Sequence, residues 1–241
     1  MTCYLALDTA TEACSVAAWL DGKVVERFEV AGREQTARLL PMIHAVLGEI
    51  GRDVGQIDGI ACGVGPGSFS GVRIGVGVAK GLALARDLPV VGVSSLAMLA
   101  QGVLRARAAE RVLAAIDARM GEIYFATFRS EKGLAVAIGP ETVCAPAAVP
   151  KAGAGTWHAA GTGWSAHEAS LRHATGAALG VVDAEALPRA ADALSLALAE
   201  FAAGRTISAD ALVPSYVRER VALTLEEQRA AKAPGRRPGG L

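Results

Sequence analysis

The residues whose types and spacing could carry chemistry form a glycine-rich turn, residues 63–75, with the sequence GVGPGSFSGVRIG. It follows the apolar run 57–62 and precedes a second apolar run, 72–85, so the pattern predicts a strand, a turn and a helix. Glycines allow close approach of the backbone, and a helix N-terminus presents unpaired N–H groups. Together they could hold an anion such as phosphate. The following helix is rich in glycine and alanine, so the segment could instead be a surface for a second protein.

A second candidate for phosphate contact is the sequence Asp8-Thr9-Ala10-Thr11 at the end of the first expected strand. A turn that simply terminates the strand explains it as well. The glycine-rich turn matches neither G-x-x-x-x-G-K-[ST] nor a clean dinucleotide motif. Ser68 and Ser70 could serve as N-caps of the next helix, and that role alone would explain them.

Constellations typical of zinc enzymes and serine hydrolases are missing from the sequence. The four histidines show no H-E-x-x-H or H-x-x-x-H spacing, and no serine lies in G-x-S-x-G. We interpret His44, on an apolar helix, as a helix-edge or interface residue. Asp117 with Arg119 and Glu122 could form a polar cluster in a cleft, or a salt bridge within a turn.

Composition limits the class of protein. The 241 residues are 52% hydrophobic and carry a net charge of zero, so tight nucleic-acid binding by this chain alone is not expected. The first 20 residues lack a basic segment, and the longest apolar runs contain charges, so neither a signal peptide nor a membrane span is indicated. The four cysteines show no C-x-x-C pair and are typical of buried free thiols, which indicates a cytoplasmic protein.

Apolar periodicity predicts an α/β chain. In the first hundred residues we expect strands at 4–7, 14–20, 23–30, 57–64 and 89–93, and helices at 36–50, 72–86 and 94–105. Beyond them we expect strands at 112–116 and 122–128, one strand within 153–163, and a helix at 190–203. The basic, Pro- and Gly-containing tail from residue 228 is typical of disorder.

A weak internal repeat suggests a duplicated domain. Residues 5–8 and 114–117 both form an apolar strand that ends at an aspartate and precedes a short turn and a second strand. We therefore expect a first half at 1–107, and a second, degenerate half at 108–224 whose last helix could return to the first. A tail follows at 225–241.

The helix after the glycine-rich turn carries two rows of small residues. Spaced by four, they are Gly71, Gly75, Ala79 and Ala83, and Gly77, Gly81 and Ala85. Glycine inside a helix costs about 1 kcal/mol relative to alanine, so close approach of another backbone is the expected compensation. The small residues could face the chain's own sheet or a helix of another subunit. The helix at 36–50 is apolar around more of its circumference than one core face requires, which favours an interaction surface.

Six segments closely resemble the bacterial TsaB family: residues 5–11, 38–43, 63–75, 80–83, 91–96 and 214–218. The string G-x-G-P-G-S-F-[ST]-G-[VL]-R-[IV]-G is long and specific. The resemblance implies an actin-like, sugar-kinase-like ATPase fold of two related α/β halves with mixed sheets. It also implies a role in making N6-threonylcarbamoyladenosine next to the anticodon of tRNA, in which a catalytic relative, TsaD, transfers the threonylcarbamoyl group.

Two departures from the related enzymes accompany this resemblance. TsaD is implied to hold a metal through an H-x-x-x-H pair on its first helix, whereas Gln35 stands where family members often keep one histidine. The ATPases have D-x-G-T in the first phosphate loop, and Ala10 stands here in place of the glycine. We therefore expect no catalytic residue, no metal and no cofactor, except ATP or ADP at the interface of a complex.

The favoured hypothesis is a scaffold that binds TsaD through the helices at 36–50 and 71–86. The expected interface residues are Leu39, Leu40, Ile43, His44, Leu47, Gly71, Val72, Ile74, Gly75, Val78, Ala79 and Leu82. Through that complex it would meet the ATPase subunit TsaE and, only indirectly, tRNA; alone it would form a homodimer. No contact with a membrane is expected.

The alternative hypothesis is a weak ATPase or phosphotransferase. Its site, vestigial under the favoured hypothesis, would comprise Asp8, Thr9, Thr11 and Asp117, with the turn at Gly161. A metallopeptidase, an older suggestion for the wider family, has no visible ligand set in this sequence.

Overall fold

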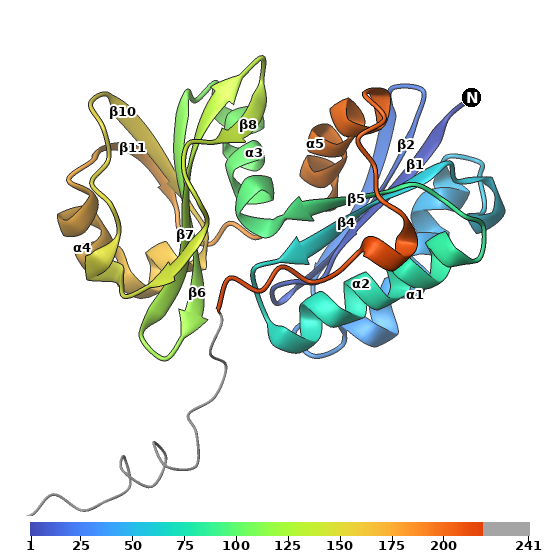
Figure 1. The fold of residues 1–241 in the computed structure, drawn as a ribbon, viewed down its shortest axis with the longest axis horizontal. Coiled ribbons are helices and arrows are strands. Elements are labelled where there is room, and N and C mark those ends of the chain that lie inside the picture. Colours follow the sequence, from blue (N-terminus) through green and yellow to red (C-terminus); the bar gives the residue numbers. More distant parts are fainter. Residues whose placement is uncertain (219–241) are drawn as a thin grey trace, which may run out of the picture.

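The computed structural model describes residues 1–218. The tail that we predicted to be disordered lies outside the described residues. The described chain forms two α/β lobes that lie side by side (Figure 1). Within that part of the chain, no helix has the length and apolar character needed to cross a membrane.

The first lobe contains a five-stranded sheet in the order β3-β2-β1-β4-β5. Its strands are β1 (Cys3–Asp8), β2 (Ala13–Leu20), β3 (Lys23–Val30), β4 (Gly59–Gly65) and β5 (Val90–Ser94). The first three strands form an antiparallel meander, and β4 and β5 extend it in parallel from β1. Helices α1 (Gln35–Glu49) and α2 (Phe69–Leu84) cover one face, and α5 (Ala190–Ala202) covers the other. Alternate residues of β1 supply the two cores: Leu5 and Leu7 face α1 and α2, and Ala6 faces α5.

The second lobe contains a sheet in the order β11-β10-β6-β7-β8, with β9 paired to β7. Its strands are β6 (Arg111–Arg119), β7 (Glu122–Glu131), β8 (Leu134–Ala137), β9 (Thr142–Cys144), β10 (Thr156–Ala160) and β11 (Ala178–Asp183). Helix α3 (Ser95–Arg107) packs on one face and α4 (Thr162–Thr175) on the other. The short 3-10 helices are η1 (Val54–Gln56), η2 (Pro146–Ala148) and η3 (Ala209–Ala211).

The two lobes have the same strand topology. In each, a central strand pairs antiparallel with the next strand in sequence and parallel with the strand that precedes a helix: β1 with β2 and β4, and β6 with β7 and β10. The resemblance between residues 5–8 and 114–117 marks these two central strands. The expected architecture, two related α/β halves with mixed sheets, is confirmed.

All of the predicted helices and strands are present, with small shifts at their ends. Helix α2 begins at Phe69, earlier than the apolar run suggested, because Ser68 caps it by accepting a hydrogen bond from the Gly71 N–H. Four elements were missed: β8, β9, β11 and α4. The strands among them are short or exposed, and α4 is polar on much of its surface, so the apolar signal is weak.

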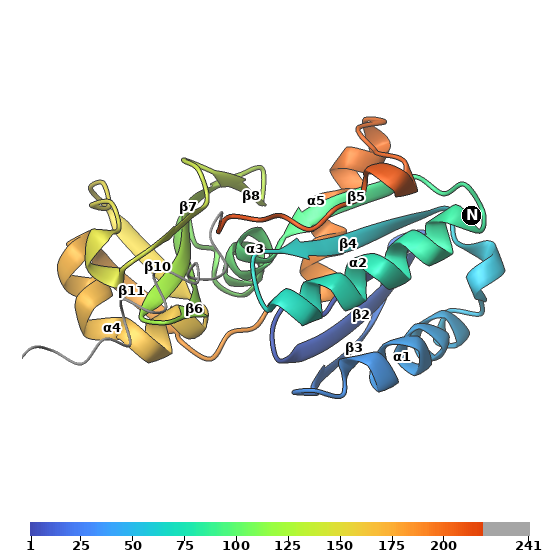
Figure 2. The same ribbon diagram turned by 60° about the horizontal axis from the view of Figure 1, so that its bottom comes forward.

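The chain returns to the first lobe after the second sheet. Helix α5 packs against β1 and β2, and Ile207 pairs with Val90 beside β5. The following segment buries Leu212 in the core of the first lobe. Residues 213–218 then cross towards the second lobe, as the red ribbon in Figure 2 shows.

Candidate functional site

The glycine-rich turn is packed against the turn that joins β1 to β2. A Cβ atom on Gly67 would lie 2.1 Å from the carbonyl oxygen of Ala10, and one on Gly71 would lie 2.2 Å from the carbonyl oxygen of Thr9. Hydrogen bonds join the same two turns: the Ser68 N–H donates to the Ala10 carbonyl at 2.6 Å, and the Thr9 hydroxyl donates to the Gly71 carbonyl at 2.7 Å. These glycines therefore allow close approach of the chain's own backbone, in the place where the sequence suggested a phosphate.

Asp8 is buried beneath this contact. One carboxylate oxygen accepts a hydrogen bond from the Ala10 N–H at 3.2 Å, and the other has no hydrogen-bond partner among the described residues. A Cβ on Gly63 would lie 1.9 Å from that second oxygen. Burial raises the pKa of Asp8 from 3.8 to about 7, although the Ala10 hydrogen bond lowers it somewhat. A carboxyl group enclosed in this way cannot reach a nucleotide or a metal ion in the cleft.

Gln35, the first residue of α1, is also buried. Its side-chain amide donates to the carbonyl of Thr11 at 2.6 Å. This hydrogen bond ties the first residue of α1 to the turn after β1. The glutamine thus has a structural partner that accounts for its presence.

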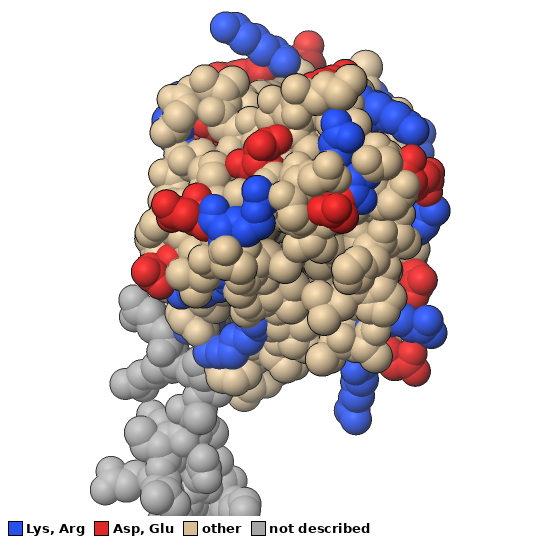
Figure 3. All heavy atoms as spheres, turned by 90° about the vertical axis from the view of Figure 1, so that its right-hand side faces the viewer, with Lys and Arg blue, Asp and Glu red and all other residues tan. Residues whose placement is uncertain are grey.

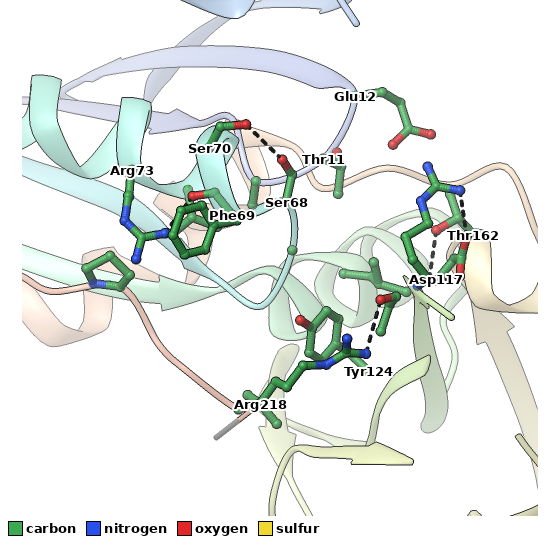
Figure 4. A pocket seen from close by; sticks show the side chains of 18 of the residues that line it. Thr11, Glu12, Ser68, Phe69, Ser70, Arg73, Asp117, Tyr124, Thr162 and Arg218 are labelled. Atoms are coloured by element: carbon green, nitrogen blue, oxygen red, sulfur yellow. Dashed lines mark hydrogen bonds and ion pairs between the residues drawn. The ribbon is translucent and has the colours of Figure 1, made fainter. Parts of the chain in front are cut away.

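A cavity of about 1000 Å³ lies between the two lobes (Figure 4). The turn after β1, the glycine-rich turn, the β6–β7 hairpin, the start of α4 and residues 214–218 line it. Of the four residues proposed for a nucleotide site, the structure brings Thr11 and Asp117 to this cavity. Asp8 and Thr9 are buried behind it, so the structure does not assemble the expected set.

Asp117 forms an ion pair within its own hairpin. Its carboxylate accepts hydrogen bonds from the backbone N–H of Arg119 at 2.9 Å and from the Arg119 guanidinium at 2.8 Å. The predicted turn salt bridge is thus confirmed, and Glu122 pairs instead with Arg218. Within residues 1–218, no group of three or more His, Cys, Asp or Glu side chains could hold a metal ion.

The first row of small residues on α2 faces the chain's own sheet. A Cβ on Gly75 would lie 2.7 Å from the Thr9 hydroxyl. This corrects the expected interface for the members whose side chains or α-carbons are buried inside the first lobe: Leu39, Ile43, Leu47, Gly71, Val72, Gly75 and Ala79. Their apolar character is explained by packing on β1, β2 and β4, so they offer no free surface to a partner.

The second row points outward. Gly77 and Gly81 are exposed, and no heavy atom outside the local helix lies within 4 Å of a Cβ built on either one. Leu40 is 48% exposed on the neighbouring helix, and His44 is exposed one turn later. Sequence reasoning noticed the second row but left both glycines out of the interface, because spacing alone does not say which row faces inward.

Helices α1 and α2 lie on the same face of the first sheet (Figure 2), and we call the uncharged exposed and half-exposed residues on their outward sides the helix face. Its members are Ala37, Leu40, Pro41, His44, Ala45 and Gly48 of α1, and Ile74, Gly77, Val78, Gly81 and Leu82 of α2.

Charged side chains of both helices contact flanking segments. Arg38 pairs with Glu29 of β3, and Lys80 donates to the Asp210 carbonyl at 3.1 Å. At the end of the first lobe, acidic and basic side chains are mixed and are separated by uncharged areas (Figure 3). Neither positive nor negative side chains gather in one patch on this face.

The chain is similar to known proteins along most of its length. A family model described as TsaD, tRNA N6-adenosine threonylcarbamoyltransferase, matches residues 28–222. The chain is 47% identical to the "tRNA threonylcarbamoyladenosine biosynthesis protein TsaB" of Escherichia coli strain K12, covering 90% of this chain and 95% of that protein. The protein of the same description from Haemophilus influenzae is 41% identical, over 90% and 94% of the two chains.

Two crystal structures from Pseudomonas aeruginosa are also similar. One, described as YeaZ, is 43% identical with a TM-score of 0.82, covering 90% of this chain and 100% of that chain. The other, described as an uncharacterised protein with similarity to peptidase YeaZ, is 44% identical with a TM-score of 0.84 and the same coverage.

Proposed function

The chain belongs to the TsaB family of tRNA threonylcarbamoyladenosine biosynthesis proteins, and from this premise we propose that it serves that biosynthesis as a non-catalytic subunit. In this proposal it binds the threonylcarbamoyltransferase TsaD through the helix face and keeps TsaD in its active arrangement. TsaE joins through the same complex, and tRNA is contacted by the other subunits. ATP or ADP would bind only at an interface with these partners.

The helix face is the observation that carries the proposal. Two exposed glycines in one helix cost about 1 kcal/mol each relative to alanine. No contact within the described chain compensates Gly77 or Gly81, because the space above both is open. A partner helix lying across α2 would approach closely over these two positions, with Leu40 and His44 on one side. A large uncharged surface of this kind is typical of a protein interface.

The interior of the fold supports a role without chemistry. The glycine-rich turn is occupied by the chain's own backbone, and Asp8 is enclosed behind it. Asp117 is paired with Arg119, and Gln35 is hydrogen-bonded to the backbone. The groups that an ATPase or a metal-dependent transferase would need are thus engaged in the fold itself.

The test is complex formation with purified TsaD, measured by size-exclusion chromatography and isothermal titration calorimetry. Gly81→Arg adds a long charged side chain to the middle of the helix face, and we expect it to weaken binding by at least about 100-fold, the scale of an interface hot spot. Gly139→Arg is the matched control, because Gly139 is an exposed glycine of the second lobe with open space around it. Gly75→Arg is unsuitable, since it would disrupt contacts with Thr9.

Modification of tRNA should follow binding. A mixture of TsaD, TsaE and the Gly81→Arg protein should lose threonylcarbamoyladenosine formation, whereas the Gly139→Arg mixture should keep it. Full binding and full modification with Gly81→Arg would refute the proposed interface.

In the absence of TsaD, we propose that the helix face pairs with itself in a two-fold symmetric dimer. Light scattering on the chain alone should give a dimer mass, and Gly81→Arg should shift it to the monomer mass. A dimer that survives this substitution would show that self-association uses another surface.

A further inference from the structure

Residues 212–218, which we call the strap, begin as part of the first lobe. Leu212 is 1% exposed in the core beneath α2. Three residues later, the Ser215 N–H donates to the carbonyl of Val64, in β4, at 2.8 Å. The first half of the strap is therefore fixed to the first lobe by burial and by a backbone hydrogen bond.

The middle of the strap contacts the first turn of α2. Arg73 of α2 donates a hydrogen bond to the hydroxyl of Tyr216, and its guanidinium carbon lies 5.1 Å from the centre of the Tyr216 ring. The same guanidinium lies 3.4 Å from the centre of the Phe69 ring and donates to the Phe69 carbonyl at 2.8 Å. Arg73 thus connects Tyr216 to the residue at which α2 begins, next to the helix face.

The end of the strap reaches the second lobe. The Arg218 guanidinium donates to the Ala118 carbonyl at 3.1 Å and to the Glu122 carboxylate at 2.6 Å. The side chain is only 16% exposed, and Met120 at the tip of the same hairpin lies 3.8 Å from it. One guanidinium thus links a segment anchored in the first lobe to the β6–β7 hairpin of the second (Figure 4).

The strap and α3 join the lobes at different places. Helix α3 packs on β6, β7 and β10, and it also contacts α5 of the first lobe. The strap crosses at the cavity, where residues 214–218 form part of the wall. In Figure 1 the strap lies below α3, so the Arg218 contacts are a second connection between the lobes.

We propose that the strap is a clamp and that Arg218 is its positioning residue. Arg218 holds the two lobes at one spacing, and through Tyr216 and Arg73 it fixes the first turn of α2 beside the helix face. Its effect on partner binding rests on the proposed function, whereas its effect on the lobes does not.

The test uses hydrogen–deuterium exchange on the full chain, wild type against Arg218→Ala. Removing a hydrogen-bonded charge should raise the local opening equilibrium roughly 10-fold or more. Amides of residues 117–122 and of residues 68–73 should therefore exchange faster by about that factor. Arg218→Lys should restore part of the protection, because it keeps the charge but lacks the fixed planar geometry of the guanidinium. Arg172→Ala, which breaks an exposed ion pair on α4, is the control and should leave both segments unchanged.

If Arg218→Ala leaves the exchange protection of both segments unchanged, the proposal that the strap is a clamp is wrong. If protection changes only in residues 117–122, the proposed connection between Arg218 and α2 is wrong. If Arg218→Ala does not fold, Glu122→Gln removes the charge at the other end of the contact and should give the same pattern. Spin labels at Lys23→Cys and His173→Cys, exposed positions on the two lobes, with Cys144→Ser, provide a second readout. The distance distribution between them should broaden in Arg218→Ala.

Affinity for TsaD separates this inference from the proposed function. Arg218→Ala should weaken TsaD binding several-fold, even though the helix face with Gly81 is unchanged in this variant. If the wild-type chain does not bind TsaD, the proposed function fails, and the exchange and distance measurements still decide the clamp. If the wild type binds and Arg218→Ala binds equally well, the role of Arg218 in positioning α2 is refuted.

Discussion

The α-carbon of Gly71 faces the carbonyl of Thr9 so closely that a Cβ would lie 2.2 Å from the oxygen, while the Thr9 hydroxyl donates to the Gly71 carbonyl at 2.7 Å. The residues that resemble an anion cradle in the sequence are thus joined to each other. The contact joins the turn after β1 to the first turn of α2, which follows β4 of the same sheet. This contact closes the turn and fixes the start of α2 over β1.

Gly71→Ala should destabilise the protein by about 3 kcal/mol, because the new methyl group must displace the Thr9 backbone. Gly77→Ala is the matched control in the same helix, and it should stabilise the protein by about 1 kcal/mol, since its Cβ meets open space. Urea unfolding of both variants measures the difference. Similar effects of the two substitutions would contradict the assignment of inner and outer rows.

Asp8 should make the protein less stable as pH rises through neutrality. Burial raises its folded-state pKa to about 7, whereas the unfolded chain releases the proton near 3.8. The folded state therefore holds one more proton between these values, and stability falls by roughly 4 kcal/mol from about pH 4 to pH 7 on this account. Asp8→Asn cannot ionise, so its stability relative to wild type should increase steadily from pH 5 to pH 7.

Urea unfolding at pH 5, 6, 7 and 8 checks this prediction. Glu49→Gln, on an exposed carboxylate of α1, is the control and should show no comparable trend over the same range. A constant stability difference between Asp8→Asn and wild type at all four pH values would show that Asp8 is already ionised in the fold.

Asp192 should anchor α5 through Arg105 of α3. The carboxylate is 1% exposed and accepts two hydrogen bonds from the guanidinium, at 2.8 and 3.2 Å. Burial raises the pKa of Asp192 in spite of this partner, which lowers it. Arg105→Leu should cost about 2 kcal/mol, less than the loss of a fully buried pair because Arg105 is half exposed.

Thermal unfolding measures this cost, and Arg129→Leu, in an exposed ion pair of β7, is the comparison. The double variant Arg105→Leu with Asp192→Asn should recover part of the loss, since no unpaired carboxylate then remains buried. If Arg105→Leu and Arg129→Leu lower the free energy of unfolding equally, the buried carboxylate of Asp192 has no special role in stability.

The isolated chain should not bind ATP with Mg²⁺. Asp8 is enclosed, and the Asp117 charge is already paired with Arg119, so the two carboxylates are not placed to share a metal ion. Calorimetry at millimolar ATP should show no saturable heat, and phosphate release should equal that of buffer. Micromolar binding with turnover that Asp117→Asn abolishes would instead favour the ATPase hypothesis.

The sequence by itself determined the order of the helices and strands of the first hundred residues, the strands β6, β7 and β10, the helix α5, and the duplication of the domain. The apolar periodicity of strands and helices and the Ser68 N-cap are local signals, and each depends only on neighbouring residues. The two central strands, β1 with Asp8 and β6 with Asp117, were visible as a repeat for the same reason. The family followed from the long glycine-rich string, which needs no structure to be recognised.

Only the tertiary structure decided which side of α2 faces away from the sheet and which acidic side chains reach the cleft. The rows that begin at Gly71 and Gly77 have equal spacing in the sequence, and the position of the helix over β1 and β4 selects the first as the inner row. Asp8 and Asp117 lie at or near the ends of equivalent strands, yet one is enclosed by the glycine-rich turn and the other lies at the cleft. These differences arise from contacts between residues more than fifty positions apart, and a local pattern carries no information about them.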